Sequence, residues 1–121
     1  MITVSDIQPK ARKGYTGAKG VDNHTCYSAE IEHGKSIRLY GYHQHKEFNI
    51  TFNIGDIAEY DSYNLKYMGK IVKITANTVT IDGKNTGVGN KRLSLYEFAW
   101  RNYDFDLEKI SAQNHETSLH I

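Results

Sequence analysis

A length of 121 residues suits a single domain over 1–121 with its own core, and one cysteine, Cys26, excludes an intramolecular disulfide framework. Fifteen Lys and Arg against fourteen Asp and Glu give a net charge of +1, so the chain lacks the basic excess of dedicated duplex-binding proteins. No apolar run approaches the roughly 20 residues that cross a bilayer, and the start of the chain has no apolar signal region. We therefore expect a cytoplasmic protein with no membrane partner.

Residues 8–20 are the first distinct segment, with three glycines, the only proline and no hydrophobic periodicity. This composition, with four cations, predicts a flexible basic segment. One interpretation is an electrostatic arm that contacts phosphates, with Tyr15 free to stack on a base. The other is a loosely packed surface segment without a binding role.

Alternation of apolar and polar residues predicts three strands in the first half of the chain, at 25–33, 36–42 and 48–54. In the second of these, Ile37 and Leu39 face inward, while Arg38, Tyr40 and Tyr42 face outward. A turn at 33–34 connects the first two strands. The pattern is typical of an antiparallel sheet with one buried face.

The stretch 54–82 holds the densest β-branched sequence and predicts a β-meander. A strand begins at Ile57, turn-forming residues occupy 61–64, and extended chain resumes at 65–68. Gly69 is expected to break or bulge the strand. The run 70–75 places Val72 and Ile74 on one face, and 78–81 forms the next strand.

Three short motifs in this stretch resemble small barrels of the KOW and Src-homology type. They are Gly-Asp at 55–56, Tyr-x-Gly-x-Ile-x-x-Ile at 67–74 and Thr-Val-Thr-Ile at 78–81. Over 55–75 and 91–110 the chain also resembles small uncharacterised proteins carried by bacteriophages and plasmids. The first resemblance implies a small β-barrel, and the second implies a mobile-element origin. Neither assigns catalytic residues.

The segment 82–92 has three glycines and three cations and predicts a mobile loop, interpreted either as a phosphate contact or as a solvated hairpin tip. Ser94 and Glu97 have the spacing of a capping box, which predicts a helix that begins at Leu95 and reaches 101 or 102. A second helix is expected over about 106–114. The predicted fold is therefore mainly β (β+α): a small antiparallel barrel or meander of about six strands with one or two short C-terminal helices.

Two histidine-containing pairs could supply metal ligands, because residues two apart on a strand share a face. The pairs are His24 with Cys26, and His43 with His45. Neither forms the tight knuckle of most structural zinc sites, and exposed polar residues are the more common reading. We expect no cofactor, and since no catalytic constellation has suitable spacing, no enzyme activity.

Tyrosines interleaved with cations predict a binding surface, because small barrels hold single strands by base stacking and phosphate attraction. Ordinary cross-strand aromatic packing is the alternative. The candidate binding residues are Arg38, Tyr40, Tyr42, Tyr60, Tyr63, Lys66, Tyr67, Lys70, Lys73, Lys84, Lys91 and Arg92. The expected partner is nucleic acid or a nucleoprotein complex, with no small-molecule substrate. The alternative is an accessory protein of a mobile element that binds and inhibits a host protein, for example a defence or CRISPR-type complex.

Overall fold

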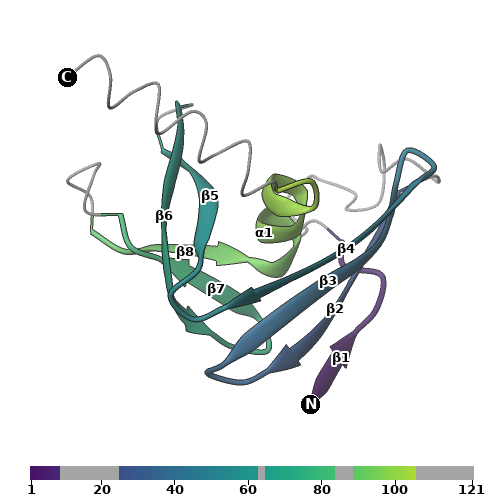
Figure 1. Cartoon of the computed structure of the whole chain (residues 1–121), viewed down its shortest axis with the longest axis horizontal. Coiled ribbons are helices and arrows are strands. Elements are labelled where there is room, and N and C mark those ends of the chain that lie inside the picture. Colours follow the sequence, from purple (N-terminus) through teal and green to yellow (C-terminus); the bar gives the residue numbers. More distant parts are fainter. Residues whose placement is uncertain (9–24, 63–64, 84–88, 106–121) are drawn as a thin grey trace, which may run out of the picture.

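The computed structural model describes residues 1–8, 25–62, 65–83 and 89–105 (Figure 1). Within these ranges, eight strands form two antiparallel four-stranded sheets, each with its strands in sequence order. Sheet A comprises β1 (Ile2–Val4), β2 (Cys26–Glu32), β3 (Ser36–His43) and β4 (Lys46–Asn53). Sheet B comprises β5 (Ile57–Ser62), β6 (Leu65–Ile74), β7 (Thr78–Ile81) and β8 (Lys91–Ser94), and α1 (Leu95–Asn102) follows it directly.

Sheet A confirms the alternation predicted from the sequence. Ala29 and Ile31 of β2 are buried with Ile37 and Leu39 of β3, and Phe52 of β4 completes this inner face. The register pairs these inward residues directly across the strands. The intervening residues form an outer face that is polar, as expected for an antiparallel sheet with one buried side.

Sheet B contains an irregularity at Val72 that corrects the sequence prediction. The register between β6 and β7 shifts between Ile71 and Lys73, which is the mark of a β-bulge. The extra residue allows both Ile71 and Ile74 to be buried, while Val72 and Lys73 are exposed. The prediction that Val72 shares the face of Ile74 is therefore wrong, and the bulge lies beyond Gly69.

The two sheets meet at the turn between β4 and β5. The Gly55 N–H donates to the Ile71 carbonyl, and the Ile71 N–H donates to the Asp56 carbonyl, so the turn is attached to β6. In Figure 1, α1 lies in the angle that the sheets enclose. Phe98 of α1 packs edge-on against Phe52 of β4, with ring centroids 5.2 Å apart, so one core joins sheet A to the helix.

The helix begins as its capping box predicts. The Glu97 N–H donates to the Ser94 side-chain oxygen over 3.1 Å, and Ser94 is the N-cap residue. Leu95, Phe98 and Ala99 are buried, whereas Trp100 is exposed on the flank. Among the described residues, the structure has no helix that is long and apolar enough to span a bilayer.

Two features of the predicted fold differ from the structure. Among the described strands neither sheet closes on itself, so of the two forms that we expected, a barrel or a meander, the structure supports the meander, with eight strands in place of about six. The predicted loop over 82–92 is too long, because Lys91 and Arg92 begin β8, which pairs with β7. Residues 84–88, almost all of the basic segment 8–20 and the residues 106–114, for which a second helix is predicted, lie outside the described residues.

Candidate functional site

The outer face of sheet A carries three of the predicted binding residues. Arg38, Tyr40 and Tyr42 alternate along β3 with buried positions, as the sequence predicted. The register places Glu30, Ser28 and Cys26 of β2 opposite them on one side, and Thr51, Asn49 and Glu47 of β4 on the other. We call Arg38, Tyr40, Tyr42 and these cross-strand neighbours the tyrosine face.

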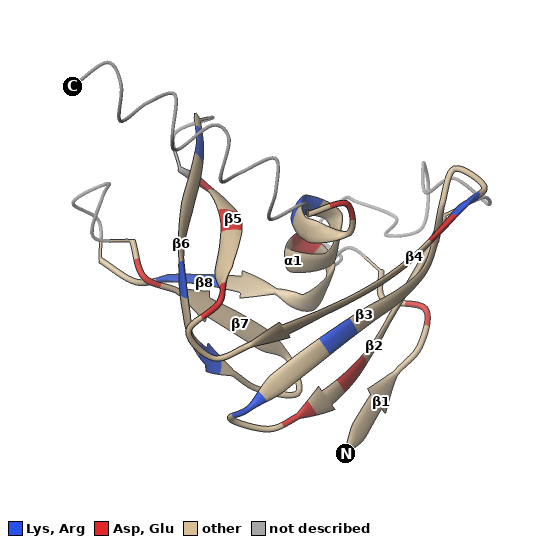
Figure 2. Cartoon of the chain, in the orientation of Figure 1, with Lys and Arg blue, Asp and Glu red and all other residues tan. Residues whose placement is uncertain are grey.

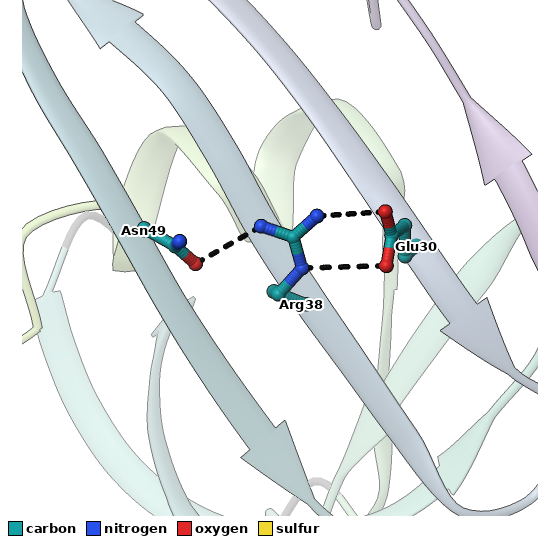
Figure 3. Close-up of polar contacts among 3 residues, drawn as sticks. All are labelled: Glu30, Arg38 and Asn49. Carbon is teal, nitrogen blue, oxygen red and sulfur yellow. Dashed lines mark hydrogen bonds and ion pairs between the residues drawn. The ribbon is translucent and has the colours of Figure 1, made fainter.

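Arg38, on the middle strand of this face, is held by polar contacts on both neighbouring strands (Figure 3). Its Nη2 donates to Glu30 Oε1 over 2.7 Å and its Nε donates to Oε2 over 3.4 Å, while its Nη1 donates to Asn49 Oδ1 over 3.2 Å. The guanidinium also lies 4.3 Å from the centre of the Tyr40 ring. Hydrogen bonding to Arg38 lowers the pKa of Glu30, so the pair is charged at neutral pH.

The other predicted cations gather on sheet B. Thr80 of β7 lies directly between Lys73 of β6 and Arg92 of β8, so these three side chains share the outer face of the sheet. Lys66 and Lys70 alternate with Tyr67 and Gly69 on β6, on the face opposite to buried Tyr60. Lys66, Lys70, Lys73 and Arg92 are exposed on this outer face, and we call them the cationic face. Lys91 is also exposed, but it lies opposite buried Ile81, on the inner side of the sheet.

None of the ion pairs found among the described residues involves the cationic face. The one carboxylate directly across from it, Asp61 opposite Lys66, is bound by Arg101 of α1. Figure 2 shows the cations of β6 and β8 on the half of the molecule that holds sheet B, away from β3. The cationic face and the tyrosine face therefore lie on different sheets.

Tyr60 is not at the surface, which corrects its predicted placement. It is 1 % exposed, and its ring packs against Tyr67 with centroids 5.7 Å apart. The cause is the two-residue period of a strand: Tyr60 and Tyr67 are a directly opposed pair on the inner face, so Lys66 and Lys70 point the other way. The expected interleaving of tyrosines and lysines on one face is absent here, where ordinary cross-strand packing occurs instead.

The described members of the predicted metal pairs do not converge. Cys26 lies opposite Tyr42 on the outer face of sheet A, whereas His43 follows at the next position and lies on the inner side. There His43 stacks on Tyr103 at 4.2 Å, and a 2.8 Å hydrogen bond joins its Nδ1 to the Tyr27 hydroxyl. Burial and a hydrogen bond to Asp6 raise the pKa of the Cys26 thiol, which disfavours the reactive thiolate.

A hollow that the sequence analysis did not foresee runs along β4. Its volume is about 430 Å³, and five consecutive residues of β4, from Phe48 to Phe52, form one wall. Because successive residues face opposite sides of a strand, a hollow lined by all five lies along the strand's free edge. Asp56, Ile57, Tyr103, Asp104 and Phe105 line the remainder, and we call this hollow the edge groove. The uncharged run 48–52 is the signal in the sequence that points to it.

Comparison of the chain with protein-family models, with curated protein sequences and with solved structures found no match. Function is therefore inferred from the three surfaces of the molecule itself: the tyrosine face, the cationic face and the edge groove. Of the predicted site residues, Tyr63, Lys84 and His24 lie outside the described residues, and His45 is in the exposed turn between β3 and β4.

Proposed function

We propose that the protein is a non-enzymatic binding module that binds nucleic acid, alone or within a nucleoprotein complex, through the cationic face. The observation that supports this is the gathering of Lys66, Lys70, Lys73 and Arg92 on the outer face of sheet B, with Lys91 next to Arg92 on the other face. Exposed cations that form no ion pair with a described carboxylate are available to neutralise phosphates and release counterions, which is the main source of sequence-independent affinity. The resemblance to bacteriophage and plasmid proteins fits such a role in a mobile element.

The proposed contact is with phosphates rather than with bases. The tyrosines next to the lysines in sequence, Tyr60 and Tyr67, pack against each other on the inner side of sheet B. A row of cations without stacking rings follows a charged backbone and reads no sequence. Duplex DNA carries the higher charge density, so we expect it to bind at least as tightly as single strands.

Fluorescence polarisation with labelled single-stranded and duplex oligonucleotides tests this function. With up to four phosphate contacts, we expect the logarithm of the association constant to fall with the logarithm of salt concentration at a slope of about −2.8 to −3.6. Absence of binding at low salt, or binding that salt does not weaken, would contradict the proposal.

A matched pair of double variants tests whether binding depends on where the charges lie or only on the net charge of the protein. Lys70→Glu with Lys73→Glu reverses two charges on the cationic face, and Lys35→Glu with Lys46→Glu reverses two exposed charges away from it, in the turn between β2 and β3 and at the start of β4. Each Lys→Glu change removes two units of charge, so both double variants move the net charge from +1 to −3. The first variant is expected to lose binding about ten-fold more strongly than the second. Equal losses of binding in the two double variants would show that binding depends on net charge alone, which contradicts a binding site at the cationic face.

The tyrosine face favours a second candidate, a mobile-element accessory protein that binds and inhibits a host protein. Tyr and Arg are enriched at protein interfaces, and Tyr42, which is 41 % exposed, lies on the same face as the ordered Arg38. A shallow hollow of about 490 Å³ lies over these residues, Tyr40, Glu47 and Asn49. Pull-down from a bacterial lysate with wild-type protein and with Tyr42→Ala distinguishes this candidate: a stoichiometric partner that the variant loses supports it.

A further inference from the structure

The free edges of the two sheets differ in how they are protected. An edge strand presents unpaired main-chain groups, and proteins shield such edges with short strands, charges or covering groups. Strand β1 has three residues, and β8 has four residues that begin with the cations Lys91 and Arg92. The edge of β5 is covered by Asn102 of α1, whose side chain binds the main chain of Glu59.

The remaining edge, that of β4, has none of these protections in its centre from any residue that the structure describes. The strand has eight residues, and its register with β3 continues without a bulge. Its central run, Phe-Asn-Ile-Thr-Phe at 48–52, contains no charge, proline or glycine. A long, regular and uncharged edge is a template for another strand.

The main-chain groups of Asn49 and Thr51 point away from β3. The Ile54 N–H donates to the Lys35 carbonyl, so Lys35 and Ile54 are a hydrogen-bonded pair of the β3–β4 ladder. Hydrogen-bonded and non-hydrogen-bonded pairs alternate along an antiparallel ladder. Counting back two residues at a time assigns Phe52, Ile50 and Phe48 to the β3 side, which leaves Asn49 and Thr51 directed to the groove.

The edge groove has the form and charge to receive one extended segment. Phe48, Ile50 and Phe52 supply an apolar side, and Tyr103 and Phe105 line the groove with them. The charged residues among its described lining are Asp56 and Asp104, both exposed and both acidic. A segment with alternating apolar residues and flanking Lys or Arg is complementary to this arrangement.

We propose that the edge groove binds an extended cationic peptide segment of another protein, which adds to sheet A as an antiparallel strand next to β4. Main-chain hydrogen bonds to Asn49 and Thr51 supply affinity, and the apolar side chains facing Phe48, Ile50 and Phe52 supply selectivity. A second copy of the chain fits less well. Its β4 would bring its own β3 roughly 4.8 Å further out, toward the wall formed by residues 103–105.

A labelled peptide of sequence Lys-Val-Thr-Val-Thr-Val-Thr-Lys is the probe, measured by fluorescence polarisation with the full chain. In the proposed register its threonines lie opposite Asn49 and Thr51, so their N–H groups point at β4. Methylation of the threonine amide nitrogens is expected to weaken binding at least ten-fold, and methylation of the valine nitrogens to weaken it much less. Replacing both lysines by glutamates is expected to weaken binding as well.

Thr51→Pro tests the edge from the protein's side, because it removes one outward N–H while the bonds between β3 and β4 remain. Proline is tolerated on edge strands when its missing N–H faces outward. We expect at least five-fold weaker peptide binding, and wild-type binding for the matched control Thr51→Val. The double variant Lys70→Glu with Lys73→Glu should bind the peptide as the wild type does, which separates this surface from the cationic face.

Three results would overturn the proposal. The first is no binding of the peptide, or equal weakening by methylation at either set of nitrogens. The second is protection of the Asn49 and Thr51 amides from hydrogen exchange in the free protein, which would mean that its own chain already occupies the edge. The third is a dimer in sedimentation whose dissociation by dilution exposes these amides, which would assign the edge to a second copy.

Discussion

The side chain of Asn102 pairs with the main chain of Glu59 as a neighbouring strand would. The Glu59 N–H donates to Asn102 Oδ1 over 2.7 Å, and Asn102 Nδ2 donates to the Glu59 carbonyl over 3.0 Å. The same Nδ2 also donates to the Phe98 carbonyl within the helix. One buried amide therefore covers the edge of sheet B and fixes the end of α1 against β5.

Replacing Asn102 by Ala is expected to destabilise the protein by about 2–4 kcal/mol, because it leaves the main-chain donor and acceptor of Glu59 without these partners. Asn102 is 0 % exposed, so water cannot easily replace the amide. Urea unfolding monitored by circular dichroism measures the change. Asn90→Ala, at an exposed position, is the control and should change the free energy of unfolding by less than about 0.5 kcal/mol. A similarly small change for Asn102→Ala would show that the pairing contributes little.

Gly41 is expected to be far less tolerant of substitution than Gly34. Both have positive φ, +138° and +73°, but a Cβ at Gly41 would lie 2.0 Å from the Cys26 carbonyl oxygen, whereas at Gly34 it would meet nothing within 4 Å. Gly41→Ala must therefore push β2 away from β3, with an expected cost of about 3 kcal/mol or more. Gly34→Ala bears only the left-handed backbone penalty of about 1–2 kcal/mol. Thermal unfolding of the two variants checks the order, and equal midpoints would contradict it.

The strands of sheet A could be predicted from the sequence because one physical rule decides them. Buried Ala29, Ile31, Ile37 and Leu39 alternate with polar residues, and the register follows once those residues face the core. The helix was also predictable, since Ser94 and Glu97 form a local motif. In both cases neighbouring residues contain the information.

The interior face of sheet B could not be predicted in the same way. The sequence Lys-Ile-Val-Lys-Ile at 70–74 allows either Val72 or Ile71 to face the core, and the bulge that buries both Ile71 and Ile74 arises from pairing with β7. Tyr60 shows the same limit, since a tyrosine on a strand suits either an interior or an interface. The cationic face and the edge groove depend on such long-range pairing, so only their residue types were visible in the sequence.

Protonation of the Glu59 carboxylate at acid pH is expected to stabilise the folded protein relative to neutral pH. Burial is the main cause that raises its pKa in the folded state. A raised folded-state pKa contributes stability that is present below the ordinary pKa of Glu, about 4.3, and is lost as the pH rises through the folded-state value. Glu59→Gln should therefore be more stable than the wild type at about pH 7 and equal to it at about pH 3. Urea unfolding at both pH values measures this, and a variant less stable at neutral pH would show that the charge is favourable.

The contact between Arg38 and Glu30 should appear directly in the titration of Glu30. Because the guanidinium holds the pKa of this carboxyl below its ordinary value, Arg38→Gln is expected to raise it, as followed by the side-chain carboxyl resonance in NMR. Arg38→Lys should give an intermediate pKa, since an ammonium cannot reproduce the two-pronged contact made through Nε and Nη2. Lys46→Gln, at an exposed position on β4, is the control and should leave Glu30 unchanged. An unchanged pKa in Arg38→Gln would mean that the pair is not formed in solution, and Arg38 would then not be an ordered part of the tyrosine face.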